Sequence, residues 1–269
     1  MQPPFYRCAV CRHDFTVPAG TIFSDTRLPL SLWFEALWHV VNQKQGASAL
    51  GVQRVLGVSY LTAWRWLHKL RRAMVRPGRD RLAGTIEVDE VYIGGEKPGK
   101  RGRGAGGKTL VLVAAQADGS RIGRIRLMRV ANASQTVLTS AVQRIIEPNT
   151  AKVLTDGWDG YGGLMQAGYD RKIVRASAVV GENLLPRANR VASLLKRWLM
   201  GTHQGAVAHS HLDCYLDEFV FRFNRRRSRS RGRLFYRLIE QALAIAPVRC
   251  PELVGGTKPQ GIVSGEQCK

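Results

Sequence analysis

The stretch TIEVDEVYIGG, residues 85–95, is the part of the chain that best predicts its fold. Its apolar residues are mostly β-branched and alternate with polar ones, and glycines end it, which is typical of a β-strand. Glu87 and Asp89 should lie on one face of this strand and Glu90 on the other, because successive side chains point to opposite faces. Three carboxylates within four residues of a basic chain suggest a hard-metal site that faces a polyanion.

The charge of the whole chain points to nucleic acid. Its 269 residues contain 41 Lys and Arg against 20 Asp and Glu, a formal net charge of +21, and 45% of them are hydrophobic. This composition predicts a globular protein that binds a polyanion. No apolar run approaches the ~20 residues of a membrane-spanning helix, and the N-terminus lacks the layout of a signal peptide. We therefore expect a cytoplasmic protein whose five cysteines do not form a disulfide framework.

The N-terminal region, residues 1–23, contains half of a zinc-binding pattern. Cys8 and Cys11 are spaced as in a zinc knuckle, and His13 offers a third ligand. Tetrahedral zinc needs four ligands, and a complete ribbon would need its first cysteine pair upstream of Met1. Two interpretations stay open: Cys8 and Cys11 bind zinc, or they belong to a truncated ribbon that forms an ordinary turn.

Residues 24–80 have the pattern of a helix-turn-helix region. Helices are expected over 30–43, 48–56 and 60–75, with Gly57 in the tight turn and Ser59 as the N-cap of the last helix. Because the last helix is basic, we expect it in the major groove of DNA. The predicted contact residues there are Tyr60, Thr62, Arg65, Lys69 and Arg72. The alternative is a small helical bundle with a solvated basic face.

Two further basic segments are expected to contact phosphate. The glycine-rich stretch 94–107 carries Arg101 and Arg103, and a dense cluster over 225–231 includes Arg225, Arg226 and Arg227. Lysine and arginine side chains supply most phosphate contacts in DNA complexes. The cluster over 225–231 could instead be a solvated face.

Two later segments offer partners for the acids of the first strand. Asp156 follows a short buried strand over 152–155, a position where α/β folds often place site residues. On the helix expected over 186–199, Asn189 and Lys196 are seven residues apart, point the same way and lie opposite the apolar stripe. Other roles stay open: Asp156 as a turn residue, Asn189 as a plain N-terminal helix residue with Glu182 as the nearest replacement, and Lys196 as a surface lysine.

The order of the expected elements is that of an RNase H-like fold. Three strands, a helix and a strand are followed by mixed helices and strand over residues 81–250, and a loose tail is expected over 251–269. This predicts an α/β domain with a mixed five-stranded sheet and flanking helices, preceded by the helix-turn-helix region. The first and fourth strands are neighbours in that fold, so Asp89 and Asp156 would meet at one metal centre.

The sequence also resembles the ISXO-like insertion-sequence transposases over nearly its whole length to about residue 250. The resemblance is carried by EVDEVYIGG (87–95), TDGWDGY (155–161), LLKRW (194–198) and HLDCYLDEFVFRFNRR (211–226), and by Cys8 and Cys11 with AGTIF (19–23). It implies an RNase H-like enzyme that cuts double-stranded DNA at terminal inverted repeats and transfers the strand by in-line displacement, using two Mg²⁺ or Mn²⁺ ions.

Carried over by position, the resemblance implies roles for four residues. Asp89, Asp156 and Asn189 would hold the metal, and Lys196 would contact phosphate or the terminal base. It also implies a homodimer or larger assembly on DNA, in a bacterial, nucleoid-associated protein. Two alternatives remain: a catalytically retired protein that binds DNA through the helix-turn-helix, and a metal nuclease without repeat specificity.

Overall fold

The computed structural model describes residues 5–76, 78–94, 108–174 and 184–254. Contacts divide these residues into two compact units, which are described separately. One unit is Arg79–Arg226, and the other contains the described residues before Arg79 and after Arg226.

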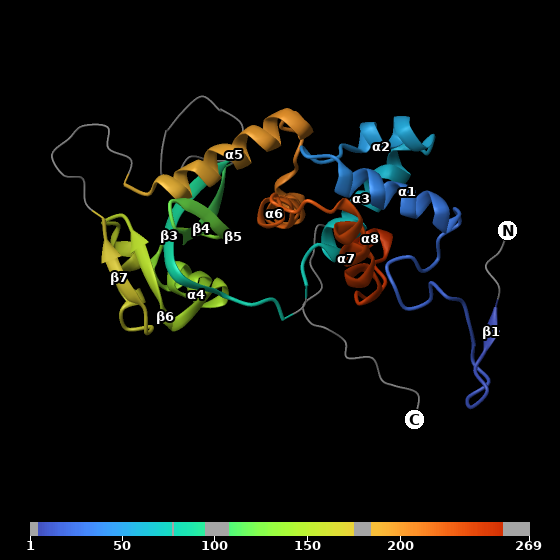
Figure 1. The fold of residues 1–269 in the computed structure, drawn as a ribbon, viewed down its shortest axis with the longest axis horizontal. Coiled ribbons are helices and arrows are strands. Elements are labelled where there is room, and N and C mark those ends of the chain that lie inside the picture. Colours follow the sequence, from blue (N-terminus) through green and yellow to red (C-terminus); the bar gives the residue numbers. More distant parts are fainter. Residues whose placement is uncertain (1–4, 77, 95–107, 175–183, 255–269) are drawn as a thin grey trace. The chain divides into compact units, whose positions relative to one another are not determined.

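A five-stranded sheet forms the centre of the unit Arg79–Arg226 (Figure 1). Its strands are β3 (Leu82–Ile93), β4 (Thr109–Asp118), β5 (Arg121–Val130), β6 (Ile146–Thr155) and β7 (Asp170–Ile173). Their order across the sheet is β5-β4-β3-β6-β7. The strands β3, β4 and β5 are antiparallel neighbours, whereas β6 runs parallel to both β3 and β7. This order and these directions are those of an RNase H-like sheet, so the predicted fold class is confirmed.

Helices cover both faces of this sheet (Figure 1). On one face lie α5 (Pro186–His203), the short η2 (His209–His211) and α6 (Leu212–Asn224), and on the other lie α4 (Gln135–Ile145) and η1 (Asp159–Leu164). Each face has its own core of buried residues. The core under α5 and α6 includes Val111, Val113, Ile125, Val191, Leu195, Leu216 and Phe219, and the core under α4 and η1 includes Ile86, Val88, Leu112, Leu138, Val142, Val153 and Tyr161. The alternation of the strands therefore decides which core each side chain enters.

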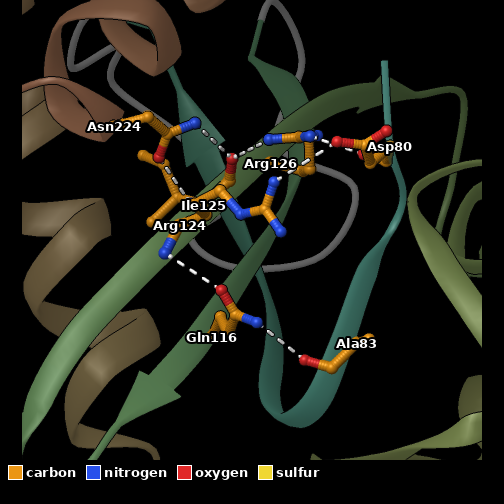
Figure 2. A network of polar contacts seen from close by, with 7 residues as sticks. All are labelled: Asp80, Ala83, Gln116, Arg124, Ile125, Arg126 and Asn224. Atoms are coloured by element: carbon orange, nitrogen blue, oxygen red, sulfur yellow. Dashed lines mark hydrogen bonds and ion pairs between the residues drawn. The ribbon is translucent and has the colours of Figure 1, made fainter. Parts of the chain in front are cut away.

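The edge strand β5 is bound to the end of α6 and to the segment that enters β3 (Figure 2). Asn224 accepts a hydrogen bond from the Ile125 backbone N–H at 2.7 Å and donates one to its carbonyl at 3.1 Å. The buried Arg126 donates to the carbonyls of Asp80, at 2.6 Å, and Ile125, at 3.0 Å. Burial, and next the charge of Arg79, lower the pKa of Arg126 to about 10. This edge is therefore satisfied within the unit and is rich in positive charge.

The other unit contains α1 (Leu30–Asn42), α2 (Ala49–Leu56), α3 (Tyr60–Ala73), α7 (Arg231–Leu243) and α8 (Cys250–Val254). The hydroxyl of Ser48 caps α2, and that of Ser59 caps α3 by accepting from the Thr62 N–H. Gly57 ends α2 at a φ of 65°, in the left-handed region that glycine adopts without strain. The helices and the turn of the helix-turn-helix thus lie where the sequence predicts.

The division into units differs from the expected domain boundaries at the C-terminal end. The helix α7 groups with the N-terminal helices, because its apolar side packs on α1, where Phe235 contacts Phe34 and Trp38 edge to face. The tail expected from residue 251 begins as part of α8, in which Leu253 is buried. Residues 255–269 lie outside the described part of the chain.

A small hairpin precedes these helices. Its strands are β1 (Tyr6–Arg7) and β2 (Asp14–Phe15), and the exposed ion pair between Arg7 and Asp14 spans them at 2.7 Å. Cys8 and Cys11 lie in the connection between the two strands. Among the helices that the structure describes, none is both long and apolar enough to cross a membrane.

Candidate active site

The register of the strands β3 and β6 bears on the predicted meeting of Asp89 and Asp156. In the parallel pair β3–β6, Glu87 lies opposite Leu154. Asp89 and Asp156 each follow two residues later, so the same register places them opposite one another at the ends of the pairing. Leu154 and Val91 pack in the core under α5, and the alternation of β3 places Asp89 on that face, whereas Asp156 follows the last residue of β6. Both aspartates are half-buried, and their meeting at one metal centre stays a prediction.

The other two acids of β3 have structural partners. Glu87 is buried, and its carboxylate accepts hydrogen bonds from the Arg187 N–H at 2.6 Å, the Ala188 N–H at 3.0 Å and the Arg187 guanidinium at 2.8 Å. Glu90 faces the opposite core, where it accepts from the Tyr161 hydroxyl at 2.6 Å. The prediction that Glu90 lies on the other face from Glu87 is therefore confirmed. Of the three acids, Asp89 is the best placed to act with Asp156.

Tyr161 belongs to the core under α4 and η1, on the face of the sheet that Glu90 enters. Its pKa is raised first by burial, next by the carboxylate of Glu90, and further by the charges of Asp89 and Asp156. Its hydroxyl therefore stays protonated and serves as the donor to Glu90.

The loop that carries Asp156 is held by Arg171 of β7. The Arg171 guanidinium donates to the Thr155 hydroxyl at 3.0 Å, to the Asp156 carbonyl at 3.3 Å and to the Trp158 carbonyl at 3.1 Å. The Asp156 carboxylate also accepts from the Trp158 N–H at 3.1 Å, so its expected turn role is present as well. A side chain that closes a turn in this way has a fixed direction, which favours a metal ligand.

Helix α5 brings the third predicted position to the same face. Asn189 lies in its first turn and Lys196 nearly two turns later, and both side chains are exposed. At about 100° per residue they are roughly 20° apart and roughly 110–130° from the centre of the buried stripe. They flank that stripe, which is built around Val191 and Leu195, and do not lie directly opposite to it as the sequence suggested.

A hard divalent cation suits this set of donors. Within the described residues, no three His, Cys, Asp or Glu side chains gather in a group that could hold a metal ion. Asp89 and Asp156 would supply two carboxylates, and the amide oxygen of Asn189 is the third ligand that the resemblance implies. Oxygen ligands of these types are those that Mg²⁺ and Mn²⁺ prefer.

The zinc prediction rests on Cys8 and Cys11. Hydrogen bonds lower the pKa of Cys8, the largest contribution coming from the backbone of Cys11 and the next from the backbone of Val10. A lower pKa favours the thiolate that binds metal. Zinc at Cys8 and Cys11 stays a prediction, and the described part of the chain offers no group of three His, Cys, Asp or Glu ligands around them.

The first residues of α3 include three of the predicted DNA contacts. Tyr60 is 49% exposed, whereas Thr62 bonds to the capping Ser59 through both its N–H and its hydroxyl. Arg65 lines a cavity of about 1030 Å³ within the same unit. Its Nε atom is buried and has no hydrogen-bond partner among the described residues.

Two other predicted contacts are used inside the unit. Lys69 donates to the Ile22 carbonyl at 3.0 Å and lies 5.8 Å from the centroid of the Trp33 ring. Arg72 donates to the Glu252 carbonyl at 3.2 Å. These two side chains therefore support the packing of α3 against the segments that flank it.

The basic cluster after α6 is partly ordered by stacking. Arg225 and Arg226 each lie 4.0 Å from an aromatic centroid, those of Phe221 and Phe223 respectively. Arg226 also donates to two backbone carbonyls of β5. The third predicted residue, Arg227, is exposed and begins the other unit. Arg101, Arg103 and Glu182 lie outside the described residues.

Sequence reasoning missed the residues that hold the site in place. No sequence pattern singles out Arg187 or Arg171, and Glu87 stands out only as one of three acids on the first strand. The sequence offers one indication of such contacts. Glu87 is expected on the same face as Asp89, and an acid that is buried there needs a hydrogen-bonding partner. Neither arginine stands out in so basic a chain.

Comparisons with known proteins agree with this geometry. Residues 81–224 match the family model of the ISXO2-like transposase domain. A protein of Halobacterium salinarum, described as an uncharacterized protein in transposable element ISH50, is 27% identical over 235 residues, which cover 81% of this chain and 77% of that protein.

Solved structures give weaker likenesses. The catalytic core domain of BIV integrase has a TM-score of 0.34 at 10% identity, covering 58% of this chain and 95% of that one. The Mos1 mariner paired end complex with Mn has a TM-score of 0.28 at 11% identity, covering 81% and 80%. Scores this low carry no argument about this chain. The family model spans more than half of the sequence and the whole sheet, and the chain belongs to the ISXO2-like transposase family.

Proposed function

We propose that this protein is an active insertion-sequence transposase that cuts DNA at the terminal inverted repeats of its element and joins the strand to a target. The proposal is supported by the register of the parallel pair β3–β6, in which Glu87 lies opposite Leu154. Extended by two residues, this register would bring Asp89 and Asp156 to one level. Glu87 binds the start of helix α5 and Glu90 accepts from Tyr161, so the contacts of these two acids fit structural roles.

The side chains fit a magnesium or manganese site. Asp89, Asp156 and Asn189 would hold the metal through oxygen atoms. Two bound ions would supply activation of the attacking water or 3′-hydroxyl and stabilisation of the leaving oxygen. The chain's own contribution is to fix the two carboxylates, through the register of the sheet and the contacts of Arg171, and to present Lys196 for a phosphate or a terminal base.

Binding of double-stranded DNA is assigned to both units. Helix α3 has its exposed first turn, with Tyr60, available for the major groove, whereas Lys69 and Arg72 stabilise the unit. Arg225, Arg226 and Arg227 would contact the backbone of DNA. Holding two element ends for strand transfer would require a homodimer or a larger assembly on DNA.

One observation supports a second candidate, a catalytically retired DNA-binding protein. The third position is Asn189, whose neutral amide is a weaker ligand for a hard cation than a carboxylate. A retired copy would bind the terminal repeat and never cut it, and substitutions of Asp89 or Asp156 would leave that binding unchanged.

The test is cleavage and joining of DNA that carries the element's own terminal repeat, in Mg²⁺ and in Mn²⁺. Wild type should cut at the repeat end, and Asp89→Asn should lower the rate by about 10³-fold or more, as expected when a metal-held catalytic centre is lost. Asp159→Asn, an exposed acid three residues after Asp156, is the matched control and should cut normally. Specific binding without any cutting by wild type would support the retired copy, and cutting of DNA without regard to the repeat would support a plain nuclease.

A further inference from the structure

The start of helix α5 has no cap of its own. Its N-cap residue, Leu185, offers no side-chain hydrogen bond, and the first helical residue is Pro186, which has no N–H. The next two N–H groups, of Arg187 and Ala188, both donate to one carboxylate oxygen of Glu87. The N–H of Asn189 then donates to the Leu185 carbonyl. Glu87, a residue of strand β3, therefore caps the helix from a distance of a hundred residues in sequence.

The same carboxylate also fixes the direction of Arg187. One guanidinium nitrogen lies 2.8 Å from Glu87, and the others donate to the carbonyls of Gly119, at 2.8 Å, and Arg121, at 3.3 Å. The helix start is thus bound to β3 and to the β4–β5 turn together. Glu87 is only 2% exposed, so water does not replace these contacts easily.

The capped turn and the capping strand carry two of the proposed metal ligands. Asn189 is one residue beyond Ala188 on α5, and Asp89 is two residues beyond Glu87 on the same face of β3. We propose that Glu87 is a positioning residue that sets the place of Asn189 relative to Asp89, a role that rests on the proposed function. It acts through the first turn of α5 and does not itself bind metal, because its oxygens are used by Arg187 and Ala188.

The proposal predicts the behaviour of Glu87→Gln, whose amide retains the shape and loses the charge. Hydrogen exchange of the α5 first-turn amides should become about tenfold faster, since a charge-assisted acceptor is lost. The affinity of the full-length protein for Mn²⁺, measured by electron paramagnetic resonance, should fall by about tenfold. Arg187→Met leaves the two backbone contacts in place and should give a smaller loss in both measurements.

Glu218→Gln is the matched control. Glu218 is 1% exposed and pairs with Arg222 at 2.7 Å within α6, so this variant also breaks a buried ion pair in the same unit. It should leave exchange in the first turn of α5 and Mn²⁺ affinity unchanged. Equal losses in both variants would show that Glu87 acts only on stability, and would overturn the proposal.

The double variant Glu87→Gln with Asn189→Ala decides whether Glu87 acts through Asn189. If it does, the double variant binds Mn²⁺ no more weakly than Asn189→Ala alone, because one ligand cannot be lost twice. Additive losses would overturn the positioning role and leave the proposed function intact. Absence of Mn²⁺ binding by wild type would overturn both, even if exchange still showed that Glu87 caps α5.

Discussion

Replacing Tyr161 with phenylalanine tests the structural role of Glu90 separately from the catalytic role proposed for Asp89. The Tyr161 hydroxyl is fully buried and donates to Glu90 at 2.6 Å. A hydrogen bond to a charged group contributes about 1.5–3 kcal/mol. Because Glu90 is half-buried and water can reach part of it, we expect Tyr161→Phe to lower the free energy of unfolding by about 1.5 kcal/mol at pH 8.

The stability difference between wild type and Tyr161→Phe should also depend on pH, which gives a second test. Burial and the nearby carboxylates raise the pKa of Tyr161 above its ordinary value in the folded state. Above pH about 10 the unfolded chain loses this proton and the folded chain keeps it, so wild-type stability falls by about 1.4 kcal/mol per pH unit from this group. The advantage of wild type over Tyr161→Phe should therefore nearly vanish by pH 11. The lowered pKa of the buried Arg126 makes stability rise with pH in this range. Arg126 is present in both proteins, so its effect cancels when their free energies of unfolding are subtracted.

Urea denaturation of both proteins between pH 7 and pH 11 measures these differences, and repeat-end cleavage is measured alongside. Tyr161→Phe should cut DNA within about threefold of the wild-type rate, because Glu90 faces away from Asp89 and Asp156. A difference in stability that stays constant up to pH 11 would refute the assignment of the raised pKa. Loss of cleavage with unchanged stability would refute the structural role of the Tyr161–Glu90 pair.

Three further outcomes are expected. Lys69→Met should lower the free energy of unfolding by about 1–2 kcal/mol with little change in DNA affinity, because Lys69 contacts Ile22 and Trp33. Urea titration measures the stability and gel shifts measure the affinity. Unchanged stability with weaker DNA binding would show that Lys69 contacts DNA. Asn224→Ala should cost about 1–3 kcal/mol by leaving the Ile125 backbone on the edge strand without partners, and an unchanged unfolding midpoint would contradict this. DNA affinity should fall steeply with salt, with a log–log slope near −5 for about six phosphate contacts, whereas a flat salt response would count against binding through arginine and lysine.

Local patterns were enough to predict most elements of the fold. Alternation predicted β3 and the opposite faces of Glu87 and Glu90, and the hydroxyl and glycine signals around residues 57–59 predicted the turn before α3. The order of the elements then predicted the sheet, because the number of ways to connect them is small. The proposed meeting of Asp89 and Asp156 follows from the parallel β3–β6 pairing, whose register ends two residues before each of them.

Contacts between segments far apart in sequence could not be predicted in this way. The cap of α5 by Glu87 joins residues a hundred positions apart, and nothing near Pro186 indicates it. Helix α7 was expected in the catalytic domain, yet it packs on α1. The apolar pattern of a helix does not say which neighbour its apolar side will contact. Because the chain has so many basic residues, the sequence alone does not show which of them stabilise the fold and which are available to DNA. Arg72 and Lys69 are among those that stabilise the fold.

The most direct test of the central claim replaces each aspartate by cysteine and compares cleavage in Mg²⁺ with cleavage in Mn²⁺. A thiolate is a poor ligand for Mg²⁺ and a better one for a softer ion such as Mn²⁺. If Asp89 and Asp156 hold the catalytic metal, Asp89→Cys and Asp156→Cys should be inactive in Mg²⁺ and regain cutting at the repeat end in Mn²⁺. Full activity of either variant in Mg²⁺, while wild type cuts in both metals, would contradict the claim that these two carboxylates form the metal centre.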